Sequence, residues 1–189
     1  MPASLTDPCR AWRKLAQMNR LANQRLHNAC AQLSPQDYTA PRASFFPSIR
    51  ETLNHILLVD RFYINALQGN RLDTAALNDA RDLTRFAALL VAQKQSDEAL
   101  LALVDSLTAQ TLARIVVVDR GDRQQQDRAD DLLSHLFQHQ THHRGQVHAM
   151  LCSTHVAPPQ LDEFIVGDDA AVREPDMAAL GWTEADLMR

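Results

Sequence analysis

The segment "FQHQTHHRGQVHAML", residues 137–151, holds four of the chain's eight histidines inside a region of helical periodicity. That region covers about residues 128–153. Its apolar residues recur at the spacing of one helix face, made of Leu132, Leu133, Leu136, Phe137, Val147, Met150 and Leu151. The segment therefore predicts a long amphipathic helix whose apolar face packs against other helices.

Three further segments show the same periodicity, at about residues 9–33, 48–69 and 83–107. The first ends before Ser34 and Pro35, which break the pattern, and the second closes at Gly69 as helices often do. Apolar residues make up 46% of the chain and aromatic residues only 5%, with five glycines, which favours helices over sheets. We therefore expect an all-α protein, and four long helices bury their apolar faces most simply as a four-helix bundle.

Between the third and fourth helices lies "ARIVVVDRGDRQQQDRAD", in which β-branched residues precede the turn-forming "DRGD". This pattern predicts a short β-hairpin or extended segment. After Ala157 two prolines open an irregular tail that we expect to pack on the bundle or on a partner subunit, with Thr183 as the N-cap of a last helix. A length of 189 residues predicts one domain, over residues 1–189.

The charge and composition exclude several classes of partner. A net charge of -4 gives no basic surface for nucleic acid. No apolar run is long enough to cross a bilayer, and the N-terminal residues lack the apolar region of a signal peptide, so we expect a cytoplasmic protein. Cys9, Cys30 and Cys152 are widely spaced and are expected to be free thiols that do not form a metal site.

A helical wheel at 100° per residue separates the histidines of the fourth helix. His143 falls roughly 40° and His139 roughly 80° from the centre of the apolar face, whereas His135 and His142 point outward and His148 is intermediate. The inward pair, spaced i, i+4, can reach one metal ion, although one packed and one surface histidine would give the same pattern. Glutamate is missing from the position after His139, which excludes the H-E-x-x-H zinc-protease motif.

A metal site in a bundle needs a third ligand from another helix. His55 lies on an apolar stripe of the second helix and is the best candidate, although a hydrogen-bonded core histidine is the alternative. The carboxylate of Asp60 falls within the same apolar arc, where a charge needs a partner. It can orient a ligand or form an ion pair with Arg144, and the ion pair is the simpler interpretation.

Gly145 is unusual in the middle of a helix, and close approach of a neighbouring backbone is the plain explanation. Its neighbours Arg144 and Gln146 can each serve a bound ligand. Exposed positions for both are the default expectation.

The motif "HQTHHRGQVHAML" resembles the signature of the DinB-like proteins, and "TLNHILLVDRFYINAL" is similar to the metal-ligand helix of that family. "MNRLANQRLHNACAQL" resembles its opening helix and "PPQLDEFIV" its usual ending, so the resemblance covers about residues 15–166. Residues 167–189 fall outside it and form a C-terminal extension.

The resemblance implies a divalent metal held by His55, His139 and His143, with water in the remaining positions, and a homodimer. Zn²⁺ and Ni²⁺ suit three imidazoles best, with Fe and Mn as alternatives. Relatives transfer low-molecular-weight thiols, which implies a metal-dependent thiol S-transferase that acts on an electrophilic small molecule. A metal-dependent hydrolase and a non-catalytic metal- or ligand-binding stress protein remain as alternatives, because the sequence indicates no catalytic base.

Overall fold

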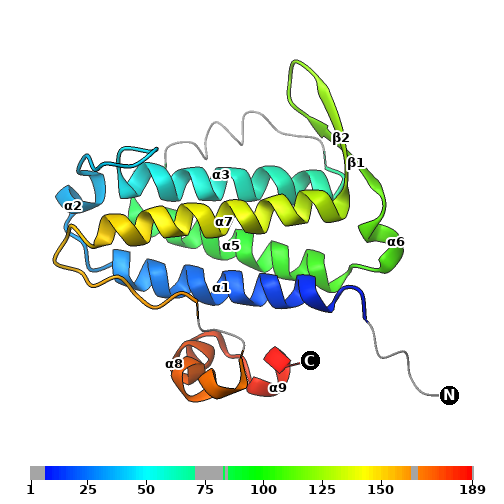
Figure 1. Cartoon of the computed structure of the whole chain (residues 1–189). Helices are drawn as coiled ribbons and strands as arrows, with labels where there is room; N and C mark the ends of the chain where they lie inside the picture. The colour runs from blue at the N-terminus through cyan, green and yellow to red at the C-terminus, as the bar shows by residue number, and fades with distance from the viewer. Residues whose placement is uncertain (1–6, 71–82, 84, 163–165, 189) are drawn as a thin grey trace.

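The computed structural model describes residues 7–70, 83, 85–162 and 166–188. Its main body consists of four long helices that lie side by side (Figure 1), namely α1 (Arg10–Cys30), α3 (Ile49–Leu67), α5 (Phe86–Asp105) and α7 (Ala129–Leu151). Helices α1 and α3 each pack against both α5 and α7. Helices α1 and α7 run in one direction and α3 and α5 in the other. The predicted four-helix bundle is therefore confirmed.

The ends of α3 follow from local sequence. The Ser48 hydroxyl accepts a hydrogen bond from the Glu51 backbone N–H at 3.2 Å and donates one to the Glu51 carboxylate at 2.8 Å. Beyond the last turn Gly69 adopts a φ of 77°, which a residue without a side chain accepts at little cost. The predicted start and stop of this helix are thus confirmed.

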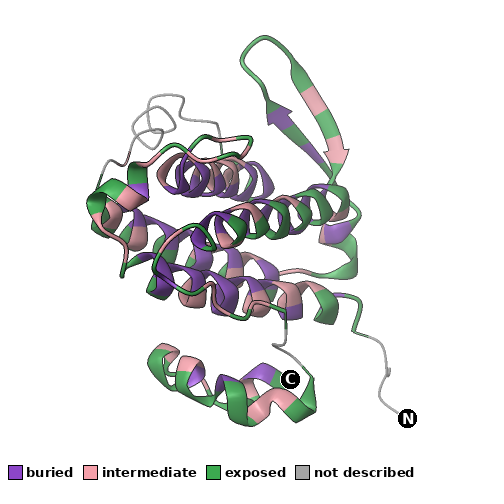
Figure 2. Cartoon of the chain, turned by 60° about the vertical axis from the view of Figure 1, so that its left-hand side comes forward, coloured by how far each residue is buried: buried purple, intermediate pink, exposed green. Residues whose placement is uncertain are grey.

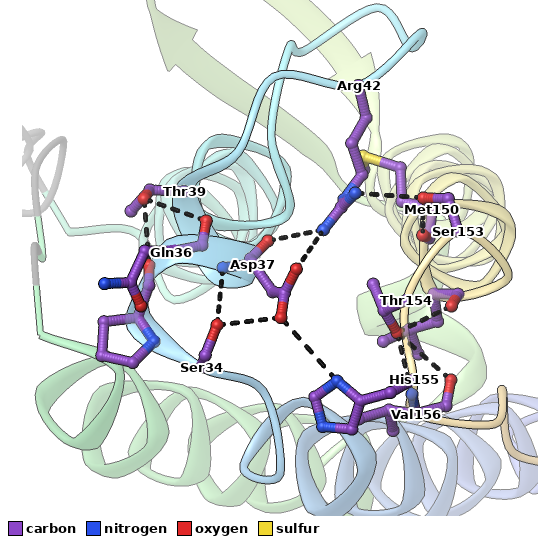
Figure 3. A network of polar contacts seen from close by, with 12 residues as sticks. Ser34, Gln36, Asp37, Thr39, Arg42, Met150, Ser153, Thr154, His155 and Val156 are labelled. Carbon is purple, nitrogen blue, oxygen red and sulfur yellow. Dashed lines mark hydrogen bonds and ion pairs between the residues drawn. The ribbon is translucent and has the colours of Figure 1, made fainter.

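A short helix, α2 (Pro35–Thr39), follows α1, so Ser34 and Pro35 end one helix and begin another. The Ser34 hydroxyl caps α2 by accepting from the Asp37 N–H at 3.0 Å. The Arg42 guanidinium then donates to the Asp37 carbonyl at 2.8 Å and to the Ser153 hydroxyl at 3.1 Å (Figure 3). These bonds fasten the segment between α2 and α3 to the end of α7.

The expected hairpin is present. It consists of β1 (Ile115–Asp119) and β2 (Gln124–Arg128), which pair antiparallel with Ile115 opposite Arg128, and it follows the short helix α6 (Ala109–Leu112). Val116 and Val118 are buried, and the intervening side chains of β1 are exposed. The hairpin therefore closes one end of the bundle with a single face.

The tail is more regular than expected. A 3₁₀ turn (Gly167–Asp169) leads into α8 (Ala170–Leu180) and α9 (Glu184–Met188), and the Thr183 hydroxyl caps α9 as predicted. Leu187 and Met177 pack against Leu21 of α1. Figure 1 shows α8 and α9 next to α1. The prediction that the tail packs on the bundle is confirmed.

Two apolar clusters fill the bundle interior, one toward the hairpin and one toward α2. Between them each long helix contributes buried polar side chains, so the purple positions in Figure 2 are not all apolar. We call these residues the buried polar network; it comprises Asn19, Arg20, Asn23, Asp60, Gln93, Asp97, Gln140 and Arg144.

None of the helices in the described parts of the chain is long and apolar enough to cross a membrane.

Candidate metal centre

Three histidines from two helices converge beside the buried polar network. His55 lies on α3, and His139 and His143 lie one turn apart on α7, which runs antiparallel to α3. Each offers one ring nitrogen, and these three atoms lie within 4.8 Å of one another. The Nε2 atoms of His55 and His139 are 2.8 Å apart. We refer to the three residues as the histidine cluster.

A neighbouring amide orients one of the rings. The Nδ1 of His143 is 2.7 Å from the Gln146 Oε1, which accepts its proton and leaves the Nε2 lone pair free. The Gln146 Nε2 in turn lies 3.1 Å from the Nε2 of His142. Gln146, predicted to be near the ligand pocket, thus contacts the cluster directly. The buried Nδ1 of His139 has no hydrogen-bond partner among the described residues.

Burial keeps the imidazoles uncharged. It lowers the pKa of His139 to about 3 and that of His55 to about 4, with the nearby rings adding a smaller effect. Burial also lowers the pKa of His143. Neutral imidazole is the form that binds a metal, so at neutral pH all three lone pairs are available.

An aromatic side chain forms one wall of the site. The ring of Phe46, on the segment that Arg42 fastens, lies 4.3 Å from the His55 ring and 5.6 Å from the His143 ring between centroids. His55 and His139 are half-buried and His143 is buried. The cluster therefore consists of packed rings, two of which are partly exposed.

The other histidines lie as the wheel predicted. His135 and His142 are exposed and His148 is half-buried. The His142 ring meets the His143 ring edge to face, with centroids 4.9 Å apart, but His142 does not belong to the cluster. His27 is buried and contacts the Phe86 ring.

Asp60 and Arg144 occupy a different setting from the one expected. No direct ion pair joins them in the described part of the chain; instead Gln140 bridges, donating to Asp60 through its amide and accepting from Arg144 at 3.1 Å. The second Asp60 oxygen accepts from Gln93 at 2.7 Å. Burial raises the pKa of Asp60 to about 6. The expectation that Arg144 is exposed was wrong, because its side chain lies between α1 and α7.

The remaining members of the buried polar network were not anticipated. Asp97 accepts from Asn23 at 2.8 Å and from Gln93 at 3.2 Å, and lies 3.5 Å from the Arg20 guanidinium. A usable signal was present, since Gln140 stands at helical spacing between buried residues of α7. A wheel that counts only apolar residues does not detect it.

The explanation expected for Gly145 is also wrong. A Cβ at this position would meet nothing within 4 Å, so no neighbouring backbone approaches it. Gly145 instead borders a cavity between α1 and α7.

The donor set fits a divalent transition metal. Three imidazoles with room for exogenous ligands are typical of catalytic metal sites, and no fourth histidine, cysteine or carboxylate joins the group among the residues described. The hydrogen bond from His143 to Gln146 is the kind of support that metal-bound histidines receive. The orphaned Nδ1 of His139 lacks that support.

Comparisons with known proteins place the chain in a family. The model of the DinB family matches residues 1–177. The protein named DinB of Bacillus subtilis (strain 168) is 28% identical over 146 residues, which cover 73% of this chain and 83% of that protein.

Proposed function

The chain belongs to the DinB family, and from this premise we propose that it is a metal-dependent thiol S-transferase whose ion is bound by His55, His139 and His143. The convergence of three neutral ring nitrogens within 4.8 Å carries the proposal. Zinc or nickel is the proposed ion, because both suit imidazole nitrogen.

A divalent ion at this position supplies the Lewis acidity that favours a thiolate over a thiol. The chain's own residues hold the three imidazoles neutral and aim them at one point, with Gln146 fixing the tautomer of His143. These are the conditions under which an added thiol can lose its proton at neutral pH.

The thiol is proposed to come from outside the chain. Burial raises the pKa of Cys30 to about 12, which keeps this thiol protonated, and Cys9 is also buried. Cys152 is exposed at the end of α7, and no cysteine belongs to the histidine cluster. A low-molecular-weight thiol is therefore the better nucleophile.

The electrophile is proposed to rest on the aromatic residues before α3. Phe45 is 80% exposed and contacts Phe46 with ring centroids 4.9 Å apart, and Phe46 contacts the cluster. Such a surface suits an apolar electrophilic molecule that must lie next to a thiolate.

The test begins with metal analysis of protein purified without a histidine tag. We expect about one divalent ion per chain. Cobalt-loaded protein is then titrated with small thiols, and a thiolate-to-metal absorption band is expected, followed by turnover of a thiol with an alkylating electrophile. Metal uptake without any thiol band would favour the non-catalytic binding protein, and turnover of an ester without a thiol would favour the hydrolase. Absence of metal uptake would overturn all three. The homodimer stays a prediction that sedimentation can check.

A further inference from the structure

The cavity beside Gly145 lies on the side of α7 that faces away from the histidine cluster. It has a volume of about 450 Å³, within the range of small-molecule sites. Its walls are mainly apolar, from α1, α7 and the segment after α7, and include Leu15, Met18, Ala22, Phe137 and Leu161. On the α7 wheel Gly145 is about 160° from His143 and about 120° from His139, so this cavity and the cluster use different faces of one helix.

Two buried donors stand at its polar side. Asn19 is 1% exposed and lines the cavity, and its Nδ2 has no hydrogen-bond partner in the described residues. The orientation of this amide is fixed, because its oxygen accepts from the Arg144 Nη1. A buried amide group without a partner costs about 1–3 kcal/mol, so a ligand oxygen that accepts from it would bind favourably.

Arg144 also lines the cavity and is 8% exposed. Within the described chain its hydrogen bonds all leave from Nη1 and reach amide oxygens of Asn19, Asn23 and Gln140. No carboxylate pairs directly with this buried guanidinium in the part of the chain that the structure describes. Buried arginine generally pairs with a planar anion, which is the partner missing here.

Gly145 leaves space for a ligand. A Cβ added there meets nothing within 4 Å, so the helix could carry a larger residue without a clash in the free protein. Asp162, the acidic residue in the described lining, is exposed to solvent and accepts a hydrogen bond from Gln160. The cavity thus combines apolar walls with buried donors at one side.

We propose that this cavity binds a small carboxylate with an apolar body, whose oxygens accept from Asn19 Nδ2 and the Arg144 guanidinium while the body lies against Leu15, Met18, Phe137 and Leu161. The site is separate from the histidine cluster and does not depend on the function proposed for that cluster.

The test is calorimetric titration of the metal-free full chain with octanoate and, separately, with 1-octanol. Removing the metal prevents the carboxylate from binding at an ion. Octanoate is expected to bind at least about tenfold more tightly than octanol, since only the carboxylate satisfies both donors. Equal affinity for the two, or no binding of octanoate, would overturn the proposal.

Two variants locate the site. Gly145→Leu fills the cavity and should weaken octanoate binding at least about tenfold, whereas Ala149→Leu, one turn along on the exposed surface of α7, should leave it within about twofold. Asn19→Asp keeps an oxygen toward Arg144 but replaces the free amide by a carboxylate, and should also weaken binding at least about tenfold. Unchanged binding in a folded Gly145→Leu protein, checked by thermal unfolding, would contradict the assignment.

Discussion

The histidine cluster and Asp60 of the buried polar network occupy the same level of the bundle but differ in how their polar atoms are bonded. In the cluster two ring nitrogens face each other at 2.8 Å, and the Nδ1 of His139 has no partner among the described residues. In the network both oxygens of Asp60 accept hydrogen bonds from amides. Buried groups whose bonds are complete stabilise a fold, whereas convergent groups with free lone pairs are suited to bind something else. The comparison supports a structural role for Asp60 and is consistent with the metal-binding role proposed for His55, His139 and His143.

The largest effect is expected from the cluster. His143→Ala removes one of three proposed ligands and should abolish stoichiometric metal uptake, because two imidazoles on different helices hold an ion weakly. His142→Ala should retain uptake, because its ring is exposed and outside the group. Metal analysis after dialysis measures both. Equal loss in the two variants would remove the distinction between inward and outward histidines.

Asp60→Ala should produce the next largest effect, on stability. It leaves the amides of Gln93 and Gln140 without an acceptor inside the bundle, which we expect to cost about 3 kcal/mol of unfolding free energy. The exposed Asp105→Ala should stay within about 0.5 kcal/mol of the parent. Urea denaturation measures both. A stable Asp60→Ala protein that loses metal would instead place Asp60 with the chemistry.

The variant Gln146→Ala tests the hydrogen bond between Gln146 and His143 of the histidine cluster. Without the Gln146 Oε1 the tautomer of His143 is no longer fixed, so metal affinity should fall about 10–100-fold while the fold persists. Gln138→Ala, on the exposed face of α7, is the matched control. Competition with a chelator of known affinity gives the comparison, and an unchanged constant would argue against the role of this amide.

Asp97 gives the network a pH signature. Burial, and secondarily the charge of Asp60, raises the pKa of Asp97 from 3.8 to about 7. Between about pH 4 and pH 7 this carboxyl holds a proton in the folded chain that it has lost in the unfolded chain, so its own contribution to stability falls as pH rises through this window. The fall is at most about 1.4 kcal/mol per pH unit. In Asp97→Asn this fall in unfolding free energy should be smaller. Urea denaturation of both proteins at pH 5 and pH 8 measures the difference, and an equal change in the two proteins would contradict this pKa.

The smallest effect on stability is expected at Gly145, on a side of α7 that belongs neither to the histidine cluster nor to the buried polar network. Gly145→Ala should raise the unfolding free energy by about 1 kcal/mol, because the added methyl meets nothing and alanine favours helix. Gly121→Ala should instead lower it, since Gly121 has a φ of 87° in the hairpin turn. Thermal unfolding resolves the two signs. If Gly145→Ala instead lowers the unfolding free energy, the original explanation that a neighbouring backbone approaches Gly145 closely would be supported.

The sequence was sufficient for features that depend on local pattern. Helical periodicity predicted the four-helix bundle, and Gly69 predicted the end of α3. The wheel also separated His143 from His142, because it compared positions on one helix that has a clear apolar face. Placing His55 beside them needed the resemblance to a known family, since spacing within one helix says nothing about its neighbour.

The predictions that were wrong concern features that depend on contacts between helices. Arg144 was expected at the surface because a wheel places polar residues outside, yet α7 packs against both α1 and α3, so its buried arc is wider than its apolar stripe. The helix α8 was not predicted, because the tail after Ala157 was expected to be irregular apart from a last helix capped by Thr183. The free space at Gly145 depends on where α1 and the segment after α7 lie, which no local pattern encodes.

All four long helices contribute residues to the buried polar network. Its hydrogen bonds form only when these helices have one particular alignment along the bundle axis. Asn23 of α1 meets Asp97 of α5, Gln93 of α5 meets Asp60 of α3, and Gln140 of α7 meets Asp60. A slip of a single residue along α3 would move His55 by about 1.5 Å relative to α7. Metal–nitrogen bonds tolerate only about 0.2 Å. The network therefore fixes how the long helices are aligned along the bundle axis. This alignment sets how precisely α3 and α7 can place their histidine nitrogens around one point.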